Sequence, residues 1–419
     1  MRQRRLFTQG SATAYLVKNL LAGLTVAIVA LPLALAFGIG SGLGAQAGIT
    51  TAVIAGIIAA VFGGSRLQVS GPTGAMTVIL IPIVAAYGPA AVLQVGLMAS
   101  GFLLLAAALR LGKYIHRLPT SLIEGFTAGI ALVIAMQQVA FVLGVDLRAD
   151  DHIWKSVFEE VRSWLEKPDY TALTLGLLAI LINVFGASRW PKLPLALISV
   201  LVVTLIANLA NLQVQRIGEL PGGIATLNLD FLAMGDWLVL VPAALAVAFL
   251  AGLESLLSAK IADRLSGFDT HQPNRELFGQ ALANFAVPFF GGVPATAALA
   301  RTAVNVRAGA NSRLAAVSHG VFLAIFVLLL SGWIAQIPLT ALGGVLIATA
   351  YHMVRIEELK QTASQSKLDA IVLVVTLVAT VLLDLISALL IGLALYLILR
   401  RTPLSKRLVP IDSEETLGD

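Results

Sequence analysis

The 419-residue sequence has no cysteine and few charged residues, since Asp, Glu, Lys and Arg together make up 12% of the chain. A soluble domain carries roughly 25% charged residues. The absence of cysteine excludes disulfide bonds and thiolate metal sites, and the five histidines show no metal-ligand spacing. No Gly-rich phosphate loop ending in Gly-Lys-Ser or Gly-Lys-Thr is present, which argues against a primary pump. We therefore expect no cofactor, no metal and no enzymatic activity.

Apolar residues dominate what the sequence does have: 58% are hydrophobic, and the mean hydropathy is +0.91. Apolar runs of about 20 residues, the length of a membrane-spanning helix, recur from Leu16 to Leu399. This pattern predicts an all-α polytopic membrane protein. The expected transmembrane segments are fourteen, near residues 14–43, 45–62, 65–86, 88–110, 118–143, 170–188, 193–210, 237–262, 275–290, 292–308, 313–333, 337–352, 367–383 and 385–400.

Positive charge lies mainly in the short loops on one side of these spans. The net charge is +5, but this distribution is typical of membrane orientation, and we expect no nucleic-acid partner. The opposite loops are acidic or nearly uncharged, as in residues 146–169. An even number of spans with both termini in the cytoplasm places the basic loops inside. We therefore expect an integral protein of a bacterial inner membrane.

Two hydrophobic segments about 220 residues apart are interrupted by glycine and proline: residues 63–75 (GGSRLQVSGPTGA) and 291–301 (GGVPATAALAR). Unpaired backbone groups in hydrocarbon cost several kcal/mol each, so such breaks persist only inside protein or along a cavity. Paired breaks in two halves indicate a transporter binding site. Because seven spans is an odd number, the two halves predict a seven-plus-seven inverted repeat. Chance similarity among Gly- and Ala-rich helices is the alternative.

The broken segments predict an anion site. We expect half-helices at residues 73–82 and 294–306, whose N-termini would each present unpaired N–H groups and about half a positive charge. Such ends bind anions, and prolines suit their first positions. The candidate contacts in the two segments are Gly71, Thr73, Gly74, Ala295, Thr296, Ala297 and Arg301. The alternative is a pair of continuous helices kinked at their prolines.

Two charged residues lie inside otherwise apolar stretches. Arg301, about two turns into its expected half-helix, could balance an anion, pair with a carboxylate or extend to the interface beside Arg307. Glu254 could carry a proton, hold a sodium ion together with Ser258, or form a static pair with Arg301. Burial favours the uncharged form of a carboxyl group, which suits proton coupling.

The longest polar segment, Asp146 to Lys167, predicts a short amphipathic helix on the outer surface. Its apolar residues recur at helical spacing, with charges between them. A similar piece is expected around Glu357. Both are interpreted as connectors.

Five motifs occur along the chain: LPLALAF at 31–37, residues 63–75, GFTAG at 125–129, ESLL at 254–257 and PLTALGGVL at 338–346. Together they resemble the sulfate permease (SulP) family, called solute carrier 26 in animals. The resemblance implies core and gate domains and an elevator-type movement of the core. It also implies an anion held between spans 1, 3, 8 and 10, with Phe37 among its contacts. A homodimer is one assembly that it allows.

The resemblance divides the chain into a cytoplasmic N-terminus (1–13), a first repeat (14–210), an external linker (211–236), a second repeat (237–402) and a cytoplasmic tail (403–419). Family members normally carry a C-terminal cytoplasmic STAS domain. The tail is too short to hold one, so we expect a shortened chain or an unusually short member without STAS.

Departures from the family pattern guide the predicted substrate and coupling ion. Several animal members have glutamine where Leu33 stands, and the apolar residue resembles bacterial bicarbonate-type proteins. Sodium-coupled members have aspartate and threonine in place of Glu254 and Ser258, and the longer acid favours a proton. We predict secondary active, proton-coupled symport of a carboxylate or dicarboxylate such as fumarate, or of bicarbonate. The alternatives are a sodium-coupled bicarbonate symporter and a passive channel or exchanger for sulfate or chloride.

Overall fold

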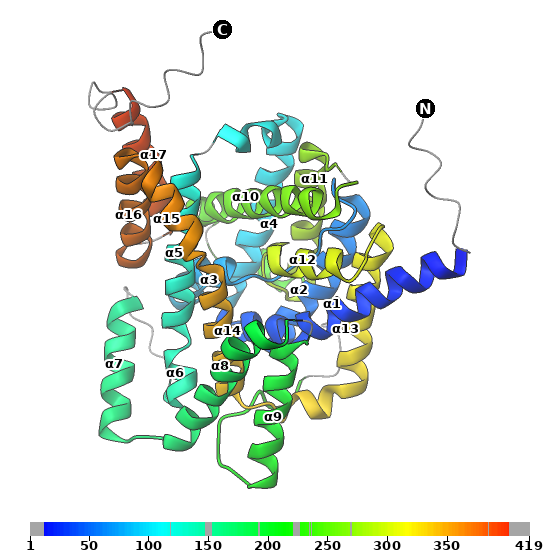
Figure 1. Cartoon of the computed structure of the whole chain (residues 1–419), viewed down its shortest axis with the longest axis vertical. Helices are drawn as coiled ribbons and strands as arrows, with labels where there is room; N and C mark the ends of the chain where they lie inside the picture. Colours follow the sequence, from blue (N-terminus) through cyan, green and yellow to red (C-terminus); the bar gives the residue numbers. More distant parts are fainter. Residues whose placement is uncertain are drawn as a thin grey trace.

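The computed structural model describes residues 12–117, 119–146, 153–191, 193–220, 227–233, 235, 237–268, 270–383 and 385–401. These residues are predominantly helical (Figure 1). The elements are α1 (Ala12–Gly40), α2 (Ala45–Phe62), β1 (Ser70–Gly71), α3 (Gly74–Tyr87), α4 (Pro89–Ala108), α5 (Thr120–Gln137), α6 (Val139–Leu143), α7 (Ile153–Glu166), α8 (Tyr170–Arg189), α9 (Leu195–Leu209), α10 (Val241–Ser266), α11 (Pro273–Ala286), β2 (Thr296–Ala297), α12 (Leu299–Arg307), α13 (Arg313–Ile334), α14 (Leu339–Met353), α15 (Ile356–Gln365), α16 (Lys367–Leu382) and α17 (Leu385–Arg401), with short 3₁₀ turns between some of them.

Eight helical stretches in the described part of the chain are long and apolar enough to cross a membrane. Two shorter apolar helices, α3 and α9, add to them. A helix rises about 1.5 Å per residue, so about 20 residues match the hydrocarbon thickness of a bilayer. The predicted helical membrane protein is confirmed, and helices lie at each of the fourteen positions expected from the sequence.

The third and tenth of these positions are discontinuous, and each begins with extended backbone. β1 and β2 pair antiparallel, with Ser70 opposite Ala297 and Gly71 opposite Thr296. α3 and α12 start only after these strands. Because both segments leave the helical conformation, the alternative of continuous helices kinked at proline is wrong.

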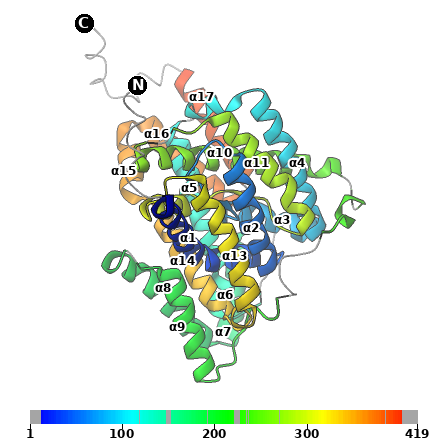
Figure 2. The same ribbon diagram turned by 90° about the vertical axis from the view of Figure 1, so that its right-hand side faces the viewer.

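Helices that correspond in the two halves make corresponding contacts. In the group formed by α1–α4 and α10–α13, α4 packs against α10 and α11, while α13 packs against α1 and α2. In the second group, α5 packs against α16, and α14 packs against α8. Figure 2 shows α2, α4 and α11 on one side of the molecule and α15 and α16 on the other. Each of these contacts therefore has a counterpart in the other half.

Small residues let these helices approach closely. A Cβ added to Gly48 of α2 would lie 1.9 Å from the carbonyl oxygen of Ala34 in α1. A Cβ added to Gly125 of α5 would lie 2.4 Å from the carbonyl oxygen of Leu373 in α16. Backbone contact of this kind is the usual way that helices associate in membranes, where burial of apolar surface gives no driving force.

The predicted amphipathic helix is confirmed as α7, which begins at Ile153; residues 147–152 of that segment lie outside the described residues. α7 packs along α5, α6 and α16. Its apolar side chains Phe158 and Leu165 are exposed, whereas Ser156 and Glu160 are buried. The second expected connector is also helical and forms α15.

Candidate functional site

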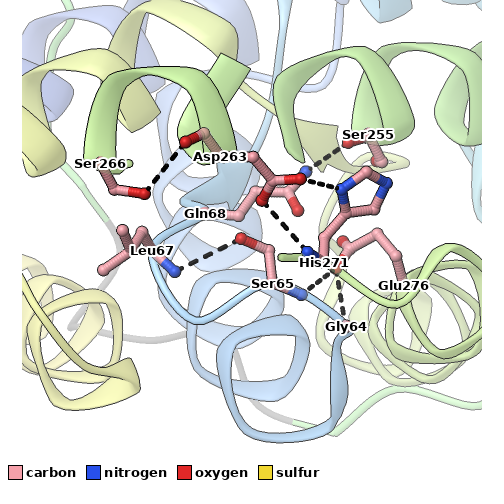
Figure 3. Close-up of polar contacts among 9 residues, drawn as sticks. All are labelled: Gly64, Ser65, Leu67, Gln68, Ser255, Asp263, Ser266, His271 and Glu276. Atoms are coloured by element: carbon pink, nitrogen blue, oxygen red, sulfur yellow. Dashed lines mark hydrogen bonds and ion pairs between the residues drawn. The ribbon is translucent and has the colours of Figure 1, made fainter. Parts of the chain in front are cut away.

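β1 and β2 lie against α2 and α10, and side chains of α10 and α12 hold them together. The N–H of Ala298 donates to the carbonyl of Val69 at 2.9 Å, and the N–H of Val69 donates to Oγ1 of Thr302 at 3.1 Å. Nε2 of Gln68 donates to the carbonyl of Ser255 at 2.8 Å (Figure 3). The two broken segments, far apart in sequence, are therefore fixed as one unit.

A buried carboxylate on α11 fixes the loop that leads into β1. Oε2 of Glu276 accepts hydrogen bonds from the N–H groups of Gly64 at 2.8 Å and Ser65 at 3.0 Å (Figure 3). Nε2 of Gln280 donates to Oε1 of Glu276 at 3.0 Å and to Oγ of Ser70 at 2.7 Å. Sequence reasoning missed Glu276, although an acid inside an expected span is itself a signal.

The connection between α10 and α11 is closed by an aspartate and a histidine. Asp263 accepts a hydrogen bond from the N–H of His271 at 3.1 Å, and its second oxygen lies 2.6 Å from Nδ1 of the same residue (Figure 3). His271 thus lies in a loop, as expected from the sequence. This contact fixes the start of α11, which carries Glu276.

The second broken segment is held by side chains that occupy its backbone groups. Nδ2 of Asn284 donates to the carbonyl of Ala295 at 2.9 Å, and the N–H of Ala295 donates to Oδ1 of Asn284 at 2.8 Å. The N–H of Ala297 donates to Oγ of Ser255 at 3.1 Å. The N–H groups of both alanines, which were predicted to contact the anion, are therefore occupied by side chains of the protein in this structure.

α12 begins five residues later than the sequence predicted, and α3 begins one residue later. α3 starts at Gly74 and α12 at Leu299, so Pro72 and Pro294 lie in extended backbone before the helices. The prediction that the prolines occupy the first helical positions is wrong. Proline lacks an N–H group, so its placement before the helix leaves the donors of the first turn in place.

The start of each half-helix presents N–H groups without intrahelical acceptors. The first bonds within the helices run from the N–H of Thr77 to the carbonyl of Thr73 at 3.2 Å, and from the N–H of Thr302 to the carbonyl of Ala298 at 2.9 Å. The preceding N–H groups have no acceptor in their own helix. Each end therefore carries the partial positive charge that favours an anion.

The two predicted threonines both face α10, but they have different partners. Thr73, the residue before α3, donates from Oγ1 to Oε2 of Glu254 at 3.1 Å. Thr296 is fully buried in β2; its Oγ1 lies 3.1 Å from Oγ of Ser255 and donates to the carbonyl of Ala251 at 3.1 Å. Both threonines interact with Glu254, Thr73 more strongly, and Thr296 is also bonded to the backbone of α10.

Arg301 is the third residue of α12, so it lies in the first turn rather than two turns into the helix. Its side chain is 1% exposed and does not extend to the surface, in contrast to the exposed Arg307. Nη2 donates to the carbonyl of Pro72, and Nη1 has no partner among the described residues. A Cβ at Gly71 would lie 2.4 Å from Nη1, so glycine provides the space that the guanidinium occupies.

Phe37 of α1, which the resemblance names as an anion contact, lies at the start of α3. A Cβ at Gly74 would lie 3.1 Å from Cε1 of Phe37 and 2.3 Å from Cδ1 of Ile134 in α5. The aromatic ring is almost completely buried. Glycine at the first position of α3 therefore allows α1 and α5 to close around the helix end.

Glu254 of α10 is partly exposed and interacts electrostatically with Arg301. In the described part of the chain the two form no direct ion pair; the carboxylate accepts the hydrogen bond from Thr73 instead. Ser258, one turn along α10, donates to Oγ1 of Thr302 at 3.0 Å. Glu254 therefore forms its hydrogen bond at the start of α3, whereas Ser258 forms its own with α12.

One histidine lies deep inside the protein. His319 is fully buried in the interior of α13, and the charge of Arg301 acts on its ring. A histidine in the middle of an apolar run is the sequence signal that could have revealed it. His116 and His152 lie where the structure does not describe side chains.

A helical membrane protein whose two broken helices meet beside buried charged residues has the architecture of a membrane transporter. The model of the Sulfate permease family matches residues 16–376. The chain belongs to this family, and it is an anion transporter of that family.

Relatives and solved structures agree with this assignment. The chain is 37% identical over 387 residues to the putative sulfate transporter YvdB of Bacillus subtilis. The matched region covers 90% of this chain and 72% of YvdB. The chain is 32% identical over 384 residues to the bicarbonate transporter BicA of Synechocystis, with 89% and 68% covered. The solved transmembrane domain of a cyanobacterium BicA superposes with a TM-score of 0.82 at 31% identity, covering 88% of this chain and 96% of that one. Murine Slc26a9 in the inward-facing state gives a TM-score of 0.84 at 18% identity, a likeness of fold that covers 94% and 69%.

Proposed function

We propose that this protein is a secondary active symporter that couples the entry of a proton to the uptake of a small anion. It would act in a bacterial inner membrane with both termini in the cytoplasm. The observation that carries the proposal is the placement of a buried cation, Arg301, and a carboxyl group, Glu254, beside the same pair of helix ends.

Electrostatics links the two ligands. Arg301 and the ends of α3 and α12 attract an anion, whereas an ionised Glu254 repels it. Two unit charges 4 Å apart interact by about 4 kcal/mol at the effective dielectric constant of a protein surface. Protonation of Glu254 removes this repulsion, so the proton and the anion bind more tightly together than either does alone.

The proposed substrate is a carboxylate or dicarboxylate of the size of fumarate, or bicarbonate. The name of the BicA relatives supports bicarbonate, and the name of YvdB keeps sulfate in the experimental panel. The buried ring of Phe37 at the start of α3 supports an anion with an apolar part, because ligand sites combine apolar walls with a few polar contacts.

We infer that an inverted repeat and an elevator-type movement underlie transport. The corresponding contacts of the two halves support the repeat. So does the matching backbone before α5 and α14: Pro119 has φ −65° and ψ 138°, and Pro338 has φ −65° and ψ 136°. The core would consist of α1–α4 and α10–α13, and the remaining helices would form the gate. Movement of the core past the gate would carry the bound anion across.

Sodium coupling is the second candidate, and one observation favours it. Oxygen atoms gather around Glu254, because it receives a hydrogen bond from Thr73 and interacts with Thr296. Hard cations prefer oxygen ligands. A passive anion channel or exchanger would use the same helix ends without either coupling ion.

Uptake by purified protein in liposomes separates these functions. Labelled bicarbonate, fumarate and sulfate are offered under an inward proton gradient, under an inward sodium gradient, or with neither. Proton-coupled symport predicts accumulation with the proton gradient alone. Accumulation that requires sodium would establish the second candidate, and downhill flux unaffected by either gradient would establish a channel or exchanger.

A further inference from the structure

His319 of α13 is fully buried, and neither of its ring nitrogens has a hydrogen-bond partner among the described residues. A neutral imidazole has one donor and one acceptor nitrogen. Buried polar groups are nearly always paired, and an unpaired one needs a physical explanation. Sequence position and family motifs assign no role to this residue.

The ring lies against α2, next to β1. A Cβ at Gly56 of α2 would lie 3.4 Å from Nδ1 of His319 and 3.4 Å from the carbonyl oxygen of Ser70. The opposite edge of the strand pair faces α10, where the N–H of Ala297 donates to Ser255. His319 therefore occupies the side of the strand pair that faces away from α10.

Arg301 reaches the same strip of α2. The Cβ position at Gly71 that lies 2.4 Å from Nη1 of Arg301 also lies 3.3 Å from the Cα of Ala52. Ala52 precedes Gly56 by four residues, so the two lie on one face of α2, about 6 Å apart along its axis. The guanidinium and the imidazole therefore line one narrow strip of small residues, and their electrostatic interaction agrees with this placement.

Two unpaired polar groups in one buried strip match the surroundings of a structural water. Buried waters typically bind two to four otherwise unsatisfied polar groups. Nη1 of Arg301 is a donor, the carbonyl of Ser70 is an acceptor, and the ring of His319 offers both functions. An apolar residue at position 319 would leave the guanidinium with one partner fewer.

We propose that His319 is a positioning residue of the anion site, which acts on Arg301 through one buried water and so orients the guanidinium toward the transported anion. This inference rests on the proposed anion-binding function. His319 itself does not touch the anion. Its loss should raise the KM for the anion while leaving the maximal rate nearly unchanged, because the translocating helices are unaltered.

The first test is a substitution series in liposomes with labelled bicarbonate, fumarate and sulfate. His319→Leu removes both ring nitrogens and should raise the KM of the transported anion between about twofold and tenfold, the worth of one hydrogen bond. His319→Asn places an amide near the position of Nδ1, and His319→Gln places one near Nε2. One of the two should restore the wild-type KM and thereby identify the nitrogen that binds the water.

The matched control is Ser318→Ala. Ser318 is the buried neighbour of His319, and its hydroxyl donates to the carbonyl of Ala315 in its own helix at 3.0 Å. The KM of the Ser318→Ala variant for the anion should stay at the wild-type value. A wild-type KM in His319→Leu would overturn the proposal. An equal rise in all three His319 variants would do the same, because it would show a packing role.

If the wild type transports none of the three anions, the proposed function is wrong. Thermal unfolding in detergent then still tests whether His319 and Arg301 are coupled. His319→Leu should lower the Tm in the wild-type background and have a much smaller effect beside Arg301→Gln, since the water bridge needs both partners. Additive shifts in Tm would show that the two residues act independently and would overturn the proposal.

Discussion

The two broken segments resemble each other in sequence, but the protein holds and uses them differently. The first segment enters through a loop whose N–H groups bind Glu276, and it ends with Thr73 facing Glu254. In the second, Asn284 binds both backbone groups of Ala295, and Thr51 similarly receives the N–H of Val293 at 2.8 Å and donates to its carbonyl at 3.1 Å.

This difference indicates a division of labour. The second segment is fixed on both sides and carries the buried cation Arg301, so under the proposed function it would provide a rigid anion-binding element. The first segment carries a hydroxyl group bonded to the titratable Glu254, so it would be the element that responds to protonation. Exact symmetry would give both segments both roles. The following substitutions test whether the roles are separate, from the largest expected effect to the smallest.

Arg301→Ala should have the largest effect. Hydrogen bonds to charged groups contribute about 1.5–3 kcal/mol, so anion affinity should fall between about tenfold and a hundredfold. The measurement is the concentration dependence of labelled-anion uptake in liposomes. Arg307→Ala, on the exposed end of the same helix, is the control and should behave as wild type. Equal affinities in the two variants would remove Arg301 from the site.

Glu254→Gln mimics the protonated carboxyl group and should separate binding from coupling. Exchange of labelled for unlabelled anion should persist, whereas acceleration by an inward proton gradient should disappear. Glu166→Gln is the control, because Glu166 is exposed. Among the described residues it forms an ion pair only with Arg162, at 3.4 Å. Proton-driven accumulation in Glu254→Gln would show that the coupling group lies elsewhere.

Gly71→Ala tests the space that the first segment leaves for Arg301. The added Cβ would lie 2.4 Å from Nη1, so the guanidinium must move, and anion affinity should fall in the direction of Arg301→Ala but by less. Gly101→Ala is the matched control, because a Cβ there meets nothing within 4 Å. Wild-type affinity in Gly71→Ala would show that the position of the guanidinium is not critical.

The threonine pair should show the smallest effects and the clearest contrast. Thr73→Val removes the hydrogen bond to Glu254 and should alter the proton dependence of uptake. Thr296→Val removes a buried bond to α10 and should lower stability by about 1 kcal/mol, measured as the free energy of unfolding or as a shift in Tm. Its change in proton dependence should be smaller than that of Thr73→Val, because Thr296 interacts with Glu254 more weakly than Thr73 does. Identical phenotypes would contradict the division of labour.

Much of the architecture could be predicted from the sequence, because the bilayer imposes length and apolarity on each span. The helix positions, the two breaks and the family followed from these features and from motifs. The start of α12 did not, because Pro294 was taken as the first helical residue. Strand pairing at Thr296 and Ala297 extends the backbone past Pro294 and delays the helix to Leu299, whereas Pro72 follows β1 and α3 begins at Gly74, one residue after its expected start.

The sequence indicated which residues meet at the two broken segments, but not which of their backbone groups are occupied by other side chains. Thr73, Phe37, Gly74 and Arg301 lie at the helix ends. Ala295, however, has its backbone occupied by a partner on another helix. Such pairings depend on tertiary packing, which spacing along one chain does not reveal.

In the proposed mechanism anion and proton move together through Glu254, and proton flux tests this coupling most directly. A pH-sensitive dye sealed inside sodium-free liposomes records proton entry when the labelled anion is added outside with the membrane potential clamped at zero. Protons should enter together with the anion in the wild type, and Glu254→Gln should exchange the anion without proton entry. Anion uptake by the wild type without proton entry would contradict this mechanism.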